Sequence, residues 1–282
     1  MNEAHACKEP EVSMPYGDEA TGGSDARVIL NADDWALNAP TTDRSLDCVL
    51  RGVVSSVSAM VFTEDSERAA DLAHEFDVDT GLHLNLTMPF SKPPRPSRLM
   101  EHQERLSRFL LSHRFAPVIY RQGLAASFDY VVKAQQEEYE RLYGAPPHRV
   151  DGHHHVHLCA NVIFQKLLPD GIIVRRNFSF EPGEKGLLNR SYRRWQDSWL
   201  ARRYRLADFF FDLTRIESRQ RFGHMCELGR RFDVEVETHP TREEEFSFLV
   251  SGEFAALAGD VPVARGYLLR SRNCHSSNQK NG

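Results

Sequence analysis

Histidines are concentrated in one short stretch of this 282-residue chain, and their spacing points to metal chemistry. The stretch reads Asp151-Gly-His153-His154-His155-Val-His157 and follows a run expected to form a strand. Imidazole is the commonest side-chain metal ligand near neutral pH. If the segment is extended, His153, His155 and His157 share one side and His154 faces away. A surface loop without function is the alternative, so the interpretation depends on ligands elsewhere in the chain.

Two other motifs offer such ligands. Asp33 and Asp34 directly follow the apolar run 28–31, and adjacent carboxylates are costly to bury without a cation or hydrogen-bonding partners. Capping of the next helix is the alternative role for this pair. His83 lies in the apolar segment Thr80–Leu86, where a single His is more often a core residue than a ligand. Its side of that segment is nevertheless polar, as expected of a strand that lines a site.

Two residues late in the chain are candidates for proton transfer and charge stabilisation. His239 follows a predicted strand and precedes Pro240, which keeps the backbone extended there. A His at that position can act as a general acid, although a structural role fits equally well. Arg175 follows Ile172–Val174, and an Arg at a strand end can orient a carboxylate or hold an oxyanion.

The elements that must position these residues alternate between short apolar runs and helical patterns. We expect helices over 39–51, 64–76, 101–112 and 119–143, the last stopped by Gly144. About seven strands that alternate with helices indicate a parallel α/β fold, either a barrel or an open sheet. The predicted strands are Val28–Asn31, Val53–Phe62, Thr80–Leu86, His148–Gly152, Ile172–Val174, Ala207–Phe211 and Val234–Thr238.

Composition limits the alternatives. The chain is 41% hydrophobic and 27% charged with a net charge of −5, which gives no reason to expect nucleic-acid binding. Residues 1–26 and 271–282 are polar and are expected to be disordered, which leaves 27–270 as one catalytic domain. Five scattered cysteines, no apolar leader and no membrane-spanning run together predict a cytoplasmic protein.

Residues 181–206 combine arginines with apolar residues at helical spacing. An amphipathic helix packed on the domain, with its arginines in solvent, is the simpler interpretation. A lid, or contact with a membrane surface, is the other hypothesis for this segment.

Asp33 and Asp34, His83, His153, Arg175 and His239 each fall at or near the end of a different predicted strand. In α/β barrels, the carboxyl ends of the strands carry the active site. Three protein ligands would leave positions on a metal open for water and substrate, as catalytic sites require. Such water, made more acidic by the ion, attacks a carbonyl.

At these motifs the chain resembles the YdjC-like carbohydrate deacetylases, which include chitooligosaccharide and hopanoid-biosynthesis deacetylases. The matching motifs are N-A-D-D, G-L-H-L-N-L-T, D-G-H-H-H-V-H, the Arg after a strand, and E-x-x-x-H-P. The resemblance implies a distorted (β/α) barrel related to the polysaccharide deacetylases. It also implies an N-acetylated sugar as substrate and often a homodimer.

For this chain, the resemblance implies that Asp34, His83 and His153 bind one divalent ion. Asp33 would be the general base, His239 the acid that protonates the leaving amine, and Arg175 the residue that orients Asp33. Family members are usually described with magnesium, whereas two His and one Asp also suit zinc.

The chain departs from the family where Trp35-Ala36 replaces the usual Phe-Gly, and a Trp there would narrow or stack against the sugar site. Another metal hydrolase, such as a two-metal phosphoesterase, is the first alternative function. An inactive metal-binding or sugar-binding protein is the second.

Overall fold

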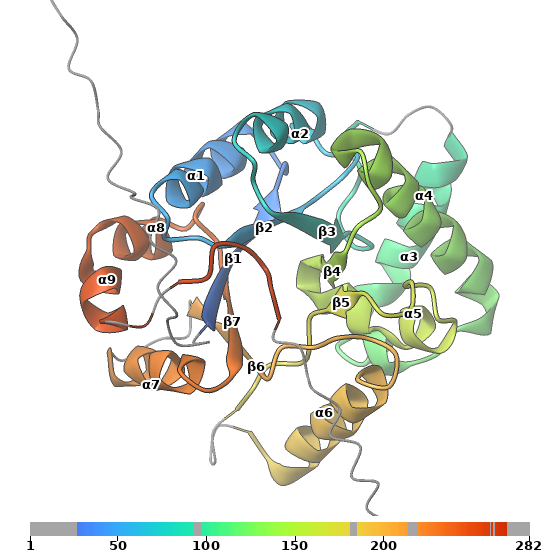
Figure 1. The fold of residues 1–282 in the computed structure, drawn as a ribbon. Helices are drawn as coiled ribbons and strands as arrows, with labels where there is room; N and C mark the ends of the chain where they lie inside the picture. The colour runs from blue at the N-terminus through green and yellow to red at the C-terminus, as the bar shows by residue number, and fades with distance from the viewer. Residues whose placement is uncertain are drawn as a thin grey trace, which may run out of the picture.

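Seven parallel strands form one sheet in the order β5-β4-β3-β2-β1-β7-β6 (Figure 1). The computed structural model describes residues 27–92, 97–180, 185–213, 219–259, 261 and 263–269. All seven predicted strands are confirmed, with ends that differ by a few residues. Their bounds are β1 (Arg27–Trp35), β2 (Ser56–Ala59), β3 (Thr80–Leu84), β4 (Arg149–Gly152), β5 (Ile173–Val174), β6 (Phe209–Asp212) and β7 (Asp233–Thr238).

Helices follow most of the strands and lie outside the sheet (Figure 1). The four helices predicted from periodicity are present, and Gly144 ends α4 in the left-handed conformation with φ of 77°. The short helices after β4 and β7, and α7 before β7, were not predicted. The bounds are α1 (Ala39–Leu50), α2 (Ser66–Glu75), α3 (Ser97–Leu110), α4 (Ala125–Tyr143), α5 (Ala160–Phe164), α6 (Leu187–Leu200), α7 (Arg219–Gly229), α8 (Glu243–Val250) and α9 (Glu253–Ala258).

The sheet curls until its two edges approach each other. Ile173 of edge strand β5 forms an isolated parallel bridge with Arg205. Farther along, the Ser179 N–H donates a hydrogen bond of 2.8 Å to the Phe210 carbonyl of edge strand β6. The fold is therefore a distorted barrel, as the family resemblance implied, and it is incompletely closed between β5 and β6.

Side chains alternate between the two sides of this curled sheet, as β geometry requires. In β7, Val234 and Val236 belong to the apolar core on the outer side. The residues between and after them, Glu235 and Glu237, are buried on the inner side, where both contact Arg175. The barrel interior is thus polar and charged around Arg175, whereas a small apolar cluster that includes Ile29, Ile173 and Tyr267 fills its floor. The layer between sheet and helices is apolar.

A segment near the end of the described chain covers the amino-terminal end of the barrel. Val263 forms a bridge with Val28 at the start of β1. The Tyr267 N–H donates to Asp79 at 2.8 Å, and the Arg149 guanidinium lies 4.4 Å from the Tyr267 ring centroid. This segment closes the floor of the barrel, opposite the strand ends that carry the predicted site.

The predicted tails, 1–26 and 271–282, lie outside the described residues. Within the described ranges, Cys48, Cys159 and Cys226 are buried and free. None of the described helices is both long and apolar enough to cross a bilayer.

Candidate metal and catalytic site

Asp33 and Asp34 both face the barrel interior because β1 is irregular at its end. Successive side chains of a regular strand point to opposite faces. Asp34 has a left-handed φ of 64°, and the pairing of β1 with β2 shifts register between Ala32 and Trp35. As a result, carboxylate oxygens of Asp33 and Asp34 lie 4.0 and 3.3 Å from the same nitrogen of His83.

The same irregularity places Trp35 in the outer apolar core, where it is fully buried. The expectation that this Trp narrows or stacks against the sugar site is therefore wrong. The physical reason is the bulge, which shifts the inside–outside alternation of the strand by one residue.

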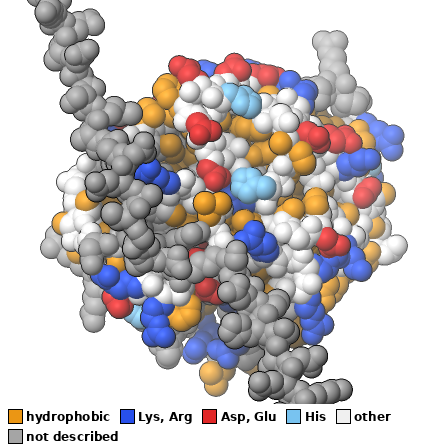
Figure 2. Space-filling view, viewed as in Figure 1, with side chains coloured by type: hydrophobic (Ala, Val, Ile, Leu, Met, Phe, Trp, Pro, Cys, Tyr) orange, Lys and Arg blue, Asp and Glu red, His pale blue; other side chains and the backbone are white. Residues whose placement is uncertain are grey.

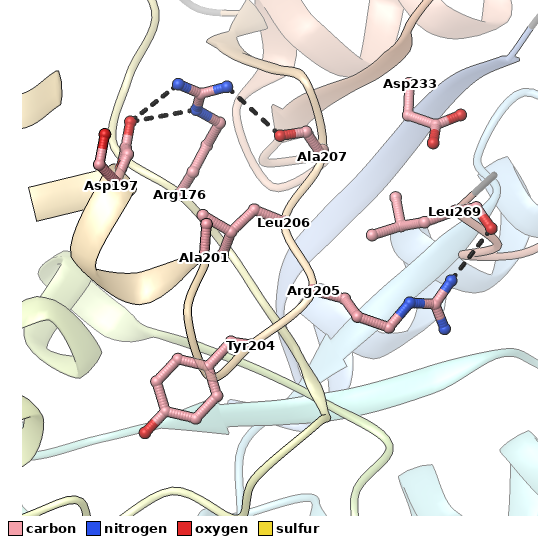
Figure 3. Close-up of a pocket in the computed structure, with 10 residues that line it drawn as sticks. Arg176, Asp197, Ala201, Tyr204, Arg205, Leu206, Ala207, Asp233 and Leu269 are labelled. Atoms are coloured by element: carbon pink, nitrogen blue, oxygen red, sulfur yellow. Dashed lines mark hydrogen bonds and ion pairs between the residues drawn. The ribbon is translucent and has the colours of Figure 1, made fainter. Parts of the chain in front are cut away.

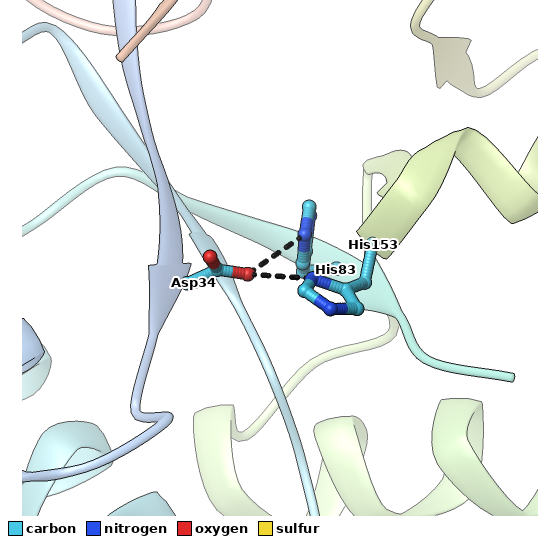
Figure 4. Close-up of side chains that lie close together, drawn as sticks. All are labelled: Asp34, His83 and His153. Carbon is cyan, nitrogen blue, oxygen red and sulfur yellow. Dashed lines mark hydrogen bonds and ion pairs between the residues drawn. The ribbon is translucent and has the colours of Figure 1, made fainter. Parts of the chain in front are cut away.

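The structure brings Asp34, His83 and His153 together from the carboxyl ends of β1, β3 and β4 (Figure 4). Oδ1 of Asp34 lies 3.3 Å from Nε2 of His83 and 3.0 Å from Nδ1 of His153. The three donor atoms are within 4.8 Å of one another, so one ion can contact all three. A carboxylate and two imidazoles are a ligand set that divalent transition metals accept, and three protein ligands leave room for water.

His83 is oriented by Asp151. Its Nδ1 lies 2.8 Å from Oδ1 of Asp151, which leaves Nε2 directed at Asp34. Burial alone would lower the pKa of His83, but the carboxylates of Asp33, Asp151 and Asp34 raise it to about 10. These carboxylates favour a positive charge at this point, which a bound divalent cation would supply.

The histidine-rich segment is a 3-10 turn, η3 (His153–Leu158), and the extended conformation expected for it is wrong. His154 and His155 have left-handed φ values of 54° and 56°. These two residues turn the chain sharply, so the side chains of His153, His155 and His157 do not share one side. The bend explains why one short stretch serves several different contacts.

Each of the other histidines in η3 has its own neighbour. Nδ1 of His154 is 3.1 Å from the Thr87 hydroxyl. The His155 ring packs edge-on to Phe178, with centroids 4.7 Å apart. The His157 Nε2–H donates to the Arg175 carbonyl at 3.0 Å. Within the described ranges, His153 is thus the one member of this turn that belongs to the metal-competent group.

Arg175 holds Asp33 through two parallel hydrogen bonds. Its Nη1 and Nη2 each lie 2.7 Å from a different carboxylate oxygen of Asp33. Burial alone would raise the pKa of Asp33, but Arg175 and then His83 lower it below its ordinary value. Asp33 is therefore an ionised carboxylate with a fixed orientation, which is the contact that the predicted orienting role of Arg175 requires.

Arg175 also contacts three other buried carboxylates. Its Nε donates to Glu235 at 2.6 Å, and its terminal nitrogens lie 3.2 Å from both Glu237 and Asp151. One guanidinium therefore contacts four carboxylates. The sequence analysis linked Arg175 to only one of them, Asp33. The alternating Val-Glu-Val-Glu pattern of β7 was the signal that marks inward-facing carboxylates.

Arg149 is a second buried guanidinium that the sequence analysis missed. It donates to the Ser58 hydroxyl at 3.0 Å, to Asp151 at 3.2 Å and to the Val57 carbonyl at 3.0 Å. A side chain at Gly81 would meet it, since a Cβ built there lies 2.6 Å from the Arg149 guanidinium carbon. Its position at the start of a strand gave no sequence signal for this role.

His239 lies beside Asp33 in the sheet but outside the three-residue group. Thr238 pairs with Ala32, so the next residue of each strand is His239 and Asp33. Nδ1 of His239 is 4.0 Å from Glu245, which also accepts the His239 backbone N–H at 2.6 Å. In the described part of the chain, no hydrogen bond joins its imidazole to Asp33 or to the metal-competent group.

A separate cavity of about 460 Å³ lies between the end of α6 and the start of β6 (Figure 3). Three of its charged groups are already bonded, since Arg176 bonds Asp197 at 2.9 Å and Arg205 donates to the Leu269 carbonyl at 3.1 Å. None of the candidate site residues lines this cavity.

With this fold and site, the chain belongs to the family of YdjC-like proteins, whose family model matches residues 27–260. It is 29% identical over 162 residues to a carbohydrate deacetylase of Danio rerio, covering 56% of this chain and 51% of the relative. It is 33% identical over 135 residues to a chitooligosaccharide deacetylase of Serratia marcescens, covering 46% and 50%. The chain thus spans about half the length of the curated relatives it matches.

The barrel is also similar to a solved structure. A crystal structure of an Enterococcus faecalis protein, described as a candidate cellobiose-phosphate cleavage protein, superposes with a TM-score of 0.59 and 17% identity. The match covers 86% of this chain and 97% of that one. At this identity the likeness establishes the fold.

Proposed function

We propose that this protein is a metal-dependent hydrolase that removes the acetyl group from an N-acetylated sugar. The observation that carries the proposal is the convergence of Asp34, His83 and His153 beside a carboxylate, Asp33, that Arg175 holds in place. Family membership and the names of the relatives support an N-acetylglucosamine-containing oligosaccharide or glycoconjugate as substrate.

Each residue has a defined part in this reaction. An ion bound by the group would polarise the amide carbonyl and make bound water more acidic. Asp33, ionised and fixed by Arg175, accepts the proton of the attacking water. His239, at the neighbouring strand end, donates a proton to the sugar nitrogen as acetate leaves.

One ion per chain is favoured over two. A second group, Asp33, His83 and Asp151, also has donor atoms within 4.8 Å of one another. However, Arg175 contacts both of its carboxylates, and Asp151 occupies Nδ1 of the shared histidine. A guanidinium charge at that place opposes a second cation, which argues against the two-metal phosphoesterase alternative.

The three ligands narrow the choice of metal without determining it. Two imidazoles and one carboxylate suit zinc, whereas magnesium prefers oxygen ligands. We propose a divalent ion, zinc or magnesium, and the identity is measured directly by elemental analysis of the purified protein.

Acetate release from N-acetylglucosamine oligomers tests the function. We expect release by the metal-loaded protein, its loss after treatment with a chelator, and its recovery when zinc or magnesium is returned. Asp34→Asn should lose both the metal and activity, while the exposed control Asp43→Asn keeps both. Metal binding without acetate release from any N-acetylated sugar would instead support the inactive binding protein.

A further inference from the structure

Helix α6 presents a row of apolar side chains to solvent. Leu188, Tyr192, Trp195 and Trp199 recur at helical spacing and therefore lie along one side of the helix. The exposed fractions of the first three are 89%, 41% and 56%, and Trp199 is partly buried. A monomeric protein rarely leaves large aromatic side chains exposed in a continuous row without a function.

The row continues beyond α6 onto two neighbouring segments. The Trp199 ring lies 6.0 Å from Phe164 at the end of α5, and Phe164 lies 6.3 Å from Tyr120. Phe164 is 52% exposed and Tyr120 is 40% exposed. We call the whole the α6 surface, and its members are Leu188, Tyr192, Trp195, Trp199, Phe164 and Tyr120.

The chain segment that carries most of this surface is basic. Between residues 185 and 205 the chain has seven Lys and Arg but one acidic residue, Asp197, although its overall charge is −5. Asp197 is buried and bonds Arg176, so it does not offset the charge at the surface. Arg194 is exposed and Arg190, one turn before it, is half-buried, and both lie on the other flank of α6 from the apolar row, near Phe178. Lys and Arg are frequent along the lower margin of Figure 2, where Figure 1 draws α6.

We propose that the α6 surface docks this protein on an anionic bilayer. Trp and Tyr rings favour the depth of the lipid headgroups, and a Leu on the same helix face inserts below them. Arginines contact the lipid phosphates. A helix of this kind lies in the plane of the interface and does not span it. The inference does not rest on the proposed function, since it uses none of the site residues.

Charge favours a bilayer over a second copy of the chain as the occupant. In a two-fold symmetric dimer the same patch meets itself, so two copies of the basic segment 185–205 would be brought together. Such like-charge contacts oppose association. An anionic bilayer neutralises the same residues, and the flat row of aromatic rings needs no complementary shape.

Co-sedimentation with vesicles tests the inference on the full chain. We expect binding to phosphatidylcholine vesicles that contain phosphatidylglycerol, weaker binding at high salt, and none to phosphatidylcholine alone. Leu188→Ser with Trp195→Ser should reduce the affinity at least about tenfold. Arg190→Gln with Arg194→Gln should reduce it about fivefold per arginine.

Matched controls come from α1 and α2, far from α6 in Figure 1. Leu50→Ser with Phe76→Ser, and Arg51→Gln with Arg68→Gln, change exposed residues and should leave binding intact. Failure of the unchanged protein to bind, equal binding to neutral vesicles, or full binding by the Leu188/Trp195 variant would overturn the inference. The inference would also be overturned if sedimentation equilibrium showed the unchanged protein to be a dimer and the Leu188/Trp195 variant to be a monomer. Acetate release from soluble oligomers should not change in any of these variants, which separates this test from that of the proposed function.

Discussion

On the outer side of the sheet, alternate residues of the strands pack into an apolar core, whereas on the inner side the intervening residues carry charge. Val150 of β4 belongs to the outer core, and Arg149 and Asp151 on either side of it form a buried ion pair. The two sides have the same backbone and the same degree of burial. They differ in whether the loss of a side chain is expected to change the stability of the barrel or its activity.

Buried ion pairs are a poor source of stability, since apolar residues of similar volume often replace them without loss. The outer core, by contrast, supplies apolar burial directly. We infer that the outer side mainly stabilises the barrel and that the inner side positions Asp33, His83 and their neighbours. Substitutions on the two sides should therefore separate activity from stability.

The largest effect should come from Asp33→Asn on the inner side. Removal of the proton acceptor is expected to lower kcat roughly 10²- to 10⁴-fold. Asp34, His83 and His153 remain, so the metal content per chain should not change. Acetate release and elemental analysis on the same sample measure both quantities, and substantial activity in this variant would remove the assignment of the base.

A substitution that leaves a cavity in the outer core should instead lower the stability and leave the activity unchanged. Phe128 of α4 is fully buried in the outer core, and Phe128→Ala should lower the free energy of unfolding by about 3–5 kcal/mol. The kcat per folded molecule should stay within about twofold, because α4 carries none of the site residues. Urea unfolding and active-site-normalised assays measure the two effects, with exposed Leu50→Ala as control. A large fall in kcat would show that the two sides are coupled.

The difference between the outer and inner sides of the sheet could be predicted from the sequence only where hydrophobic periodicity or a motif indicated it. The seven strands followed from apolar runs, because burial of a strand depends mainly on local composition, whereas the choice of a barrel over an open sheet came from the family resemblance. The proximity of Asp34, His83 and His153 followed from their common position at strand ends.

Other features depend on backbone geometry that residue types do not specify. The left-handed residues Asp34, His154 and His155 redirect side chains, and neither the bulge in β1 nor the turn η3 has a glycine at these positions to indicate it. The network around Arg175 joins residues up to 142 positions apart, and such contacts are determined by the curl of the sheet.

Gly81→Ala should disturb the inner side by crowding alone. Arg149 has little freedom to move, since its terminal nitrogens bond Ser58, Asp151 and the Val57 carbonyl. The added methyl group should lower the free energy of unfolding by about 1–3 kcal/mol. Gly123→Ala is the matched control, as a Cβ there meets nothing within 4 Å. Equal stabilities of the two variants would mean that Arg149 can leave its position without cost.

The smallest effect concerns the dependence of stability on pH. Burial lowers the pKa of His157 to about 4, from an ordinary value of 6.5. Between these two pH values the unfolded chain binds a proton that the folded chain does not, so the free energy of unfolding falls as the pH falls. The slope from this one group is at most about 1.4 kcal/mol per pH unit.

His157→Gln removes that proton while it keeps a donor for the Arg175 carbonyl. We expect the unfolding free energy of this variant to change less steeply between pH 6.5 and 4 than that of the unchanged protein, whatever its absolute stability. Urea midpoints across this range give the slope, and exposed His113→Gln should leave it unaltered. If the unfolding free energies of all three proteins had the same pH dependence, His157 would accept its proton in the folded state. The inner side would then accommodate one more charge than its packing implies.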